Sequence, residues 1–298
     1  MNTRVVASDG VRDWSAIFQS LLQLTKPGIT RVVIATSLAG AVAAPGPVTD
    51  WSRLILALVG TVLVVAAANT LNMYLERDVD GLMQRTRHRP LPTGRLSPEV
   101  ALAFGIALSA VGLPILAFGV NMLTALLNAL ALVSYVFAYT PLKRISSVSL
   151  YVGAVPGALP PVIGWAAMTD QLGIEALALF LLLFVWQIPH FHAIALFRQS
   201  EYERAGLRVY CSEKGVRRTI WAIIAFAAIQ FVVSLMPSYV GLTDMTYTAV
   251  AVVVGSVFLG WSVYGLRAPS HVSWARSLFF LSMPVLVILY SALALSAA

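Results

Sequence analysis

The chain has 298 residues, of which 59% are hydrophobic and 11% are charged, and its formal net charge is +7. This balance is too apolar for a water-soluble domain and is typical of a bundle of membrane-spanning helices. The apolar windows approach the roughly 20 residues that a helical span needs, and they lack the alternation of outer-membrane strands. The composition therefore excludes a soluble fold and favours an all-α membrane protein.

From the N terminus, residues 1–28 are expected to form a cytoplasmic tail with a short interfacial helix near residues 14–24. Residues 29–298 are expected to form one polytopic domain. Nine apolar segments predict nine transmembrane helices. They lie at 29–44, 54–75, 100–120, 122–139, 150–168, 174–197, 219–236, 247–266 and 278–295.

Basic residues indicate the orientation of these spans, because Lys and Arg concentrate in cytoplasmic loops. Of the 20 Lys and Arg residues, only Arg53 falls on the opposite side. The N terminus is therefore predicted to be cytoplasmic and, with nine spans, the C terminus to be periplasmic. The basic face suits anionic lipid headgroups and equally an anionic substrate.

The densest polar segment follows the second predicted span. Asn72, Glu76 and Asp80 are spaced i, i+4, i+8, which places them on one face of a helix. Two carboxylates about 6 Å apart repel by roughly 3 kcal/mol at an effective dielectric near 20, so a cation between them is expected. Oxygen ligands favour Mg²⁺, which commonly bridges to phosphates, and Arg85, Arg87 and Arg89 could neutralise a diphosphate. The alternative is a solvated charged loop, but ionisable groups inside a membrane favour function.

A second polar cluster follows the sixth predicted span. Pro189 is expected to kink the helix beside a cavity. His190 and His192 could each ligate a metal or a haem iron, and for either one a hydrogen bond within the bundle is an equally good explanation. The two residues point to different faces of the helix. Glu201 attracts attention only because it lies at the same membrane face as the first cluster.

Two further segments lie between these clusters. Lys143 and Arg144, which end the fourth predicted span, could bind an anion or simply anchor the helix at the interface. The fifth predicted span is rich in glycine and proline, which could serve close helix packing or a broken helix against a ligand. The sequence leaves both pairs of alternatives open.

Together these motifs resemble a known family. Asn72-x-x-x-Glu76-x-x-x-Asp80 followed by Arg85-Thr-x-x-Arg89 resembles the first acidic motif of the intramembrane aromatic prenyltransferase superfamily. The segments at 139–144, 157–165, 186–191 and 201–206 resemble its protohaem IX farnesyltransferase (haem O synthase) branch, and the match runs from about residue 25 to the C terminus. The superfamily commonly has Asp where Glu76 stands, and it commonly has a second Asp-x-x-x-Asp motif where this chain has Arg198 and Tyr202. The haem branch resembles this chain in its altered second motif.

The resemblance implies nine helices around a central cavity, with the polar motifs at its cytoplasmic end in the cell inner membrane. The implied residues are Asn72, Glu76 and Asp80 for catalysis, Arg85, Arg89, Lys143 and Arg144 for diphosphate, His190, Arg204 and Lys214 for haem, and Glu76, Asp80 and Glu201 for Mg²⁺.

The resemblance also implies a reaction. A farnesyl group would pass from farnesyl diphosphate to a vinyl group of haem B, and water addition would give haem O. Membrane lipids, and haem A synthase or a terminal oxidase under assembly, are the expected partners, with no nucleic acid. A quinone-ring or chlorin prenyltransferase is the alternative within the superfamily, and a secondary transporter is the alternative from another class.

Overall fold

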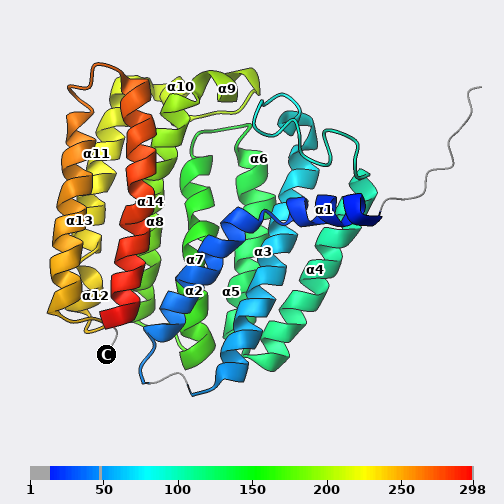
Figure 1. Cartoon of the computed structure of the whole chain (residues 1–298), viewed down its shortest axis with the longest axis horizontal. Coiled ribbons are helices and arrows are strands. Elements are labelled where there is room, and N and C mark those ends of the chain that lie inside the picture. Colours follow the sequence, from blue (N-terminus) through cyan, green and yellow to red (C-terminus); the bar gives the residue numbers. More distant parts are fainter. Residues whose placement is uncertain (1–13, 47–48, 297–298) are drawn as a thin grey trace, which may run out of the picture.

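The computed structural model describes residues 14–46 and 49–296, and within them every regular element is helical (Figure 1). The helices are α1 (Trp14–Leu24), α2 (Pro27–Val42), α3 (Trp51–Asp80), α4 (Pro98–Gly119), α5 (Met122–Val133), the π-helix η1 (Ser134–Tyr139), α6 (Thr140–Leu142), α7 (Ser149–Thr169), α8 (Ile174–Phe197), α9 (Gln199–Arg204), α10 (Tyr210–Lys214), α11 (Val216–Val233), α12 (Met236–Tyr239), α13 (Met245–Tyr264) and α14 (His271–Ser296).

Eight helical stretches in the described residues are long and apolar enough to cross a membrane. The predicted all-helical membrane fold is therefore confirmed. They are α3, α4, α5 with η1 and α6, α7, α8, α11 with α12, α13, and α14. The remaining predicted span is α2, whose 16 residues reach only about 24 Å. The ninth crossing and the side on which each terminus lies stay predictions.

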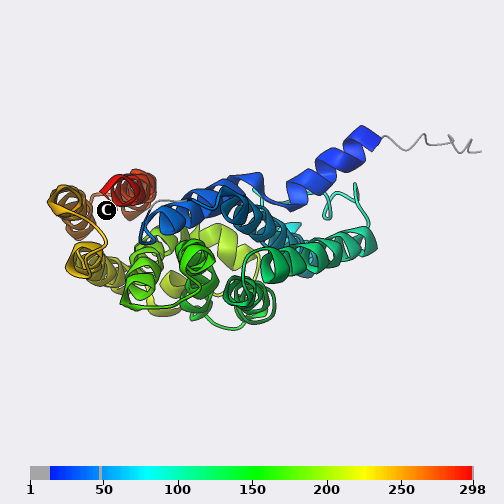
Figure 2. The same cartoon turned by 90° about the horizontal axis from the view of Figure 1, so that it is seen from below.

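The long helices run roughly side by side, and α2 crosses them obliquely (Figure 1). Helix α3 packs against α4, α2 against α7, and α8 against α7, α11 and α14. Figure 2 shows α11, α13 and α14 gathered at one side of the molecule, away from α3 and α4. Helix α8 thus joins this group to the rest of the bundle.

Close packing accounts for part of the glycine-rich fifth predicted span. A Cβ at Gly164 on α7 would overlap the backbone oxygen of Ser37, and one at Gly40 on α2 would overlap that of Pro161. Glycine lets two helix backbones approach closely in a membrane. Helix α7 is continuous from Ser149 to Thr169 despite three internal prolines, so the broken helix is wrong. Close packing explains Gly164, while Gly153, Pro156, Gly157 and Pro160 line an internal cavity.

Two segments near the predicted cytoplasmic face complete the fold. Helix α1 occupies the residues expected for the interfacial helix, and Trp14 and Phe18 on it are exposed. Figure 2 shows α1 projecting beyond the bundle. Cys211 is buried on α10, where its Sγ donates to Ala195 O at 3.4 Å. Its polar sequence neighbours suggest an exposed loop, but the short α10 packs against α8.

Candidate active site

A cavity of about 530 Å³ lies between α2, α3, α5, η1, α7 and α8. Residues of α9 and of the segment leading into α10 also line it. One end is polar, and the other is lined mostly by aliphatic side chains, with the polar Thr61 and Asn128 among them. The aliphatic lining comprises Val33, Val64, Val65, Ala68, Ala131, Leu132 and Ile163. The cavity can therefore take a molecule with a charged head and an apolar tail.

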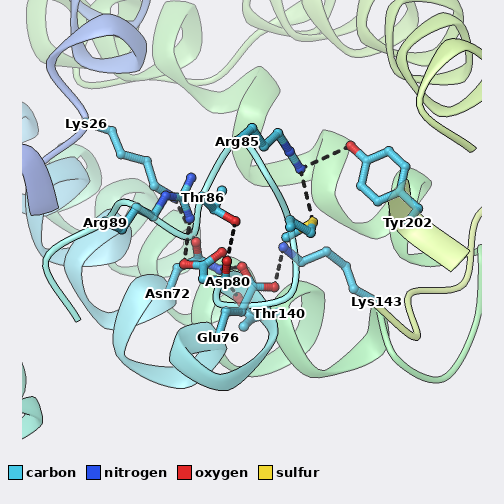
Figure 3. Close-up of polar contacts among 11 residues, drawn as sticks. Lys26, Asn72, Glu76, Asp80, Arg85, Thr86, Arg89, Thr140, Lys143 and Tyr202 are labelled. Atoms are coloured by element: carbon cyan, nitrogen blue, oxygen red, sulfur yellow. Dashed lines mark hydrogen bonds and ion pairs between the residues drawn. The ribbon is translucent and has the colours of Figure 1, made fainter. Parts of the chain in front are cut away.

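Three side chains on one face of α3 form the acidic wall of the polar end (Figure 3). Asn72 links them to a neighbouring helix. Its Nδ2 donates to Glu76 Oε2 at 2.9 Å and to Thr140 Oγ1 at 3.0 Å. Glu76 is 7% exposed and Asp80 is 1% exposed. The i, i+4, i+8 spacing thus brings an amide and two buried carboxylates to one surface, as a helix requires.

Each carboxylate has a cationic partner from another part of the chain. Lys143 forms an ion pair with Glu76. Arg89, in the loop after α3, donates to Asp80 Oδ2 at 2.7 Å. Burial alone would lower the pKa of Lys143, but Tyr139 and Glu76 raise that pKa above its ordinary value. Lys143 is therefore a stable positive charge beside the carboxylates.

The π-helical turn η1 shapes the wall opposite α3. Tyr135 and Tyr139 both line the cavity, and their ring centroids are 5.2 Å apart. Lys143 Nζ lies 4.7 Å from the centroid of the Tyr139 ring. Thr140 Oγ1 donates to Tyr135 O at 2.8 Å, which satisfies a carbonyl in this turn. Turns of this kind are frequent at functional sites, and here one carries two aromatic rings to the site.

Lys26 is a further cation at the site, and it comes from the segment between α1 and α2. Its Nζ donates to Asn72 Oδ1 at 2.8 Å (Figure 3). Burial, with the positive charges of Arg89 and Lys143, lowers the pKa of Lys26 to about 7. Its backbone φ is 50°, in the left-handed region that costs a residue with a side chain roughly 1 kcal/mol. A strained, partly desolvated lysine is typical of a functional position.

The loop after α3 is fastened to α9 at the mouth of the cavity. The Arg85 amide donates to Glu201 Oε1 at 3.3 Å, and the Arg85 guanidinium donates to Tyr202 Oη at 3.3 Å. Glu201 Oε2 accepts from Arg198 at 2.9 Å. Both Glu201 oxygens are thus engaged in holding the mouth.

His190 lines the cavity from α8. Its ring stacks on Trp186, with the ring centroids 4.8 Å apart. Its Nδ1 lies 2.6 Å from Ser282 Oγ on α14. His192 is fully buried and faces elsewhere, with its Nε2 3.4 Å from Tyr151 Oη. The two histidines therefore occupy different environments.

Some of the site residues predicted from the sequence line the cavity, and others lie outside it. Those that line the cavity are Asn72, Glu76, Asp80, Arg85, Arg89, Lys143 and His190. Those outside the lining are Arg87, Arg144, Glu201, Arg204 and Lys214. Arg144, Arg204 and Lys214 are exposed, and Arg204 Nε donates to Ser200 O at 3.2 Å.

Sequence reasoning did not select Lys26, Thr140 or Ser282 as site residues. Lys26 counts in the sequence only as a charge of the tail. Thr140 is part of the Tyr139–Arg144 motif, but no spacing links it to α3. Ser282 lies in the middle of an apolar segment and gives no local signal.

The donor set at the polar end fits Mg²⁺. Asp80 Oδ1 is buried and has no hydrogen-bond partner among the described residues. Within 14–46 and 49–296, no three His, Cys, Asp or Glu side chains are grouped to hold a metal. Mg²⁺ needs no such cage, because it typically takes one or two carboxylates together with waters and substrate phosphates. Glu76 and Asp80 match that requirement.

The fold and the cavity define a membrane-embedded enzyme for an amphiphilic anionic substrate. Residues 33–283 match the UbiA prenyltransferase family, and the chain belongs to that family of prenyl-transferring enzymes. A relative from Sorangium cellulosum named protoheme IX farnesyltransferase is 51% identical over 87% of this chain and 93% of the relative.

Solved structures share the fold. One, from work on digeranylgeranylglyceryl phosphate synthase in membranes, superposes with a TM-score of 0.80 at 14% identity, over 94% of this chain and 98% of the other. A UbiA homologue from Archaeoglobus fulgidus, bound to GPP and Mg²⁺, superposes with a TM-score of 0.67 at 19% identity, over 92% and 99%. At these identities the likeness concerns the fold alone.

Proposed function

We propose that this chain transfers a farnesyl group from farnesyl diphosphate to a vinyl group of haem B, with water addition, giving haem O and diphosphate. The relative of 51% identity carries the name of this activity. The observation that carries the proposal is that one cavity joins a cationic polar end, an aliphatic chamber and a histidine. Each substrate would occupy a different part of that cavity.

The diphosphate would occupy the polar end. Five basic side chains and two carboxylates line the cavity, for a formal charge of +3 when every basic group is protonated. Lys26, Arg89 and Lys143 lie around Asn72 and the carboxylates, and Arg85 lies at the mouth. Charge-assisted hydrogen bonds from these groups would stabilise the negative charge that develops as diphosphate departs.

Mg²⁺ would be held by Glu76 and Asp80, and the unpaired Asp80 Oδ1 is the atom best placed for it. When bound, the ion supplies Lewis-acid stabilisation of the departing phosphate oxygens. A UbiA homologue of the same fold was solved with Mg²⁺ and a prenyl diphosphate, which supports a divalent ion here. Glu201 is engaged with Arg85 and Arg198, so we propose two protein carboxylates for the ion.

The farnesyl chain would extend into the aliphatic chamber. Val64 on α3 lies about 18 Å along the helix from Glu76, since 12 residues rise 1.5 Å each. The apolar lining keeps water from the allylic cation while the diphosphate leaves. Tyr135 and Tyr139 line the same cavity, with Tyr139 beside Lys143, and their ring faces would stabilise a cation.

The haem would lie toward α8, with His190 contacting the iron. The haem propionates carry negative charge and would need cationic partners. Arg208 lines the mouth of the cavity, and Arg204 and Lys214 lie on the neighbouring α9 and α10. The vinyl electrons form the new carbon–carbon bond to farnesyl C1 and leave a cation on the carbon next to the porphyrin. Water then adds to that carbon and releases a proton, which gives the hydroxyethylfarnesyl group.

We further propose that α2 is the ninth crossing and that the polar end faces the cytoplasm. The asymmetry of basic residues supports this orientation. The N terminus would then be cytoplasmic and the C terminus periplasmic, in the cell inner membrane. Haem O would pass to haem A synthase or to a terminal oxidase under assembly.

The test uses the full-length protein in liposomes with radiolabelled farnesyl diphosphate. Haem B, an aromatic quinone precursor and a chlorin are offered separately, with Mg²⁺ or with a chelator. We expect label on haem alone, and only with Mg²⁺. Label on the quinone precursor or the chlorin would assign another branch of the family. No consumption of diphosphate with any acceptor would contradict the proposal.

A further inference from the structure

The hydroxyl of Ser282 makes two short contacts that determine which ring nitrogen of His190 carries a proton. Ser282 Oγ lies 2.6 Å from His190 Nδ1 and 2.6 Å from Phe279 O. A hydroxyl has one proton, and a carbonyl oxygen can only accept. The proton of Ser282 therefore goes to Phe279 O. Its oxygen must then accept from His190, so Nδ1 is the protonated nitrogen.

The orientation of the ring is fixed from both sides. Trp186, one turn earlier on α8, stacks on the ring at an interplanar angle of 26°. The Phe279 ring lies 4.8 Å from that of His190, centroid to centroid. Trp186 Nε1 also donates to Ser282 O at 2.8 Å. The same two helices thus hold the imidazole and its acceptor in one arrangement.

The other nitrogen, Nε2, makes no hydrogen bond within the described part of the chain, and His190 lines the cavity. In a neutral imidazole with a proton on Nδ1, Nε2 carries the lone pair. A free lone pair on a histidine that lines the cavity is suited to a haem iron, since neutral imidazole is a common axial ligand. An acceptor on Nδ1–H fixes the tautomer and raises the basicity of the ligating nitrogen.

We propose that Ser282 is a positioning residue that presents His190 Nε2 to the iron of the porphyrin substrate. Ser282 would touch neither substrate, and it would act by accepting the Nδ1–H hydrogen bond. This inference rests on the proposed function, because it needs haem in the cavity. Beyond the proposed function, it says that His190 ligates the haem iron through Nε2, that the proton of the ring is on Nδ1, and that Ser282 controls both.

The first test compares purified wild type with Ser282→Ala, Ser282→Thr and His190→Ala, each bound to ferrous haem B without farnesyl diphosphate. Resonance Raman spectroscopy reads the iron–histidine stretching band. We expect the band in wild type, its loss in His190→Ala and a shift to lower frequency in Ser282→Ala. The haem Kd should rise about tenfold in Ser282→Ala, a typical effect of losing such an outer partner. Ser282→Thr keeps the oxygen and should keep the wild-type band.

Ser262→Ala is the matched control. Ser262 is also fully buried, and its Oγ donates at 2.8 Å to Phe258 O, four residues earlier on α13, whereas Ser282 donates to the carbonyl three residues earlier on α14. This variant loses a comparable hydroxyl and should leave the band unchanged. An unchanged band and Kd in Ser282→Ala, or a band that persists in His190→Ala, would overturn the inference.

A second measurement does not depend on how well a Ser282 variant folds. In His190→Gly, an imidazole added to the solution can take the place of the missing side chain. Free imidazole has an N–H that can donate to Ser282 Oγ, whereas 1-methylimidazole has none. We expect imidazole to restore haem binding at about tenfold lower concentration. Equal potency would overturn the role of Ser282. If wild type makes haem O but the iron–histidine band, the haem Kd and the imidazole rescue do not behave as expected, only this inference is wrong. If wild type makes no haem O, the proposed function itself is wrong.

Discussion

Lys143, just after α6, forms an ion pair with Glu76 on α3, and both residues line the polar end of the cavity. We expect Lys143→Met to lower the rate of prenyl transfer at least about 100-fold. Breaking a buried pair leaves an uncompensated charge that costs about 3–5 kcal/mol, and the variant also loses a group that stabilises the departing diphosphate. The initial rate at saturating farnesyl diphosphate measures this.

Arg144→Met is the control for that variant. Arg144 is the adjacent residue and has the same charge, but it is exposed and lies outside the cavity lining. Its replacement should change the rate less than about threefold, within the usual effect of a surface position. Equal losses in both variants would mean that the basic pair acts only as an interfacial anchor.

Lys26 binds Asn72 from the segment before α2. We expect Lys26→Met to raise the KM for farnesyl diphosphate about tenfold or more, since a hydrogen bond to a charged group is typically worth about 1.5–3 kcal/mol. Lys26→Arg keeps the charge and should recover most of the affinity. Titration of the rate with farnesyl diphosphate gives both values. An unchanged KM in Lys26→Met would remove this residue from the diphosphate site.

How far the sequence predicted this site depends on how local each relationship is. Asn72, Glu76 and Asp80 were predicted on one helix face because the period of a helix fixes their neighbours. The contact of Lys26 with Asn72 spans 46 positions, and no local period encodes it. The exposure of Arg204 and Lys214 likewise depends on how α9 and α10 pack. The apolar spans were predicted well because a bilayer demands long apolar helices.

The close approach of α2 and α7 predicts a specific loss of stability. A Cβ at Gly164 would overlap Ser37 O, which is backbone and has little room to move. We expect Gly164→Ala to cost about 1–3 kcal/mol and to lower the melting temperature in detergent. Gly260→Ala on α13 is the control, because nothing lies within 4 Å of its Cβ and alanine favours a helix. Equal melting temperatures for the two variants would contradict this packing.

Cys211 offers a chemical probe of the fold near α10. Burial raises the pKa of its thiol to about 11, and the side chain is 2% exposed. The thiolate is the reactive form, so alkylation should stay slow until the pH approaches that value. At pH 8 we expect a rate at least about 100-fold below that of an unfolded sample, because an ordinary cysteine has a pKa near 8.5. Fast alkylation of the folded protein would place Cys211 in an open loop.

The most direct test of the central claim is the mass of the porphyrin recovered after wild type is incubated with haem B, farnesyl diphosphate and Mg²⁺. We expect haem to gain one farnesyl group and one hydroxyl group. Asp80→Asn should reduce this product at least about 100-fold, because it weakens the proposed Mg²⁺ site. Haem recovered without any gain in mass, from protein that consumes farnesyl diphosphate with another acceptor, would contradict the proposed reaction.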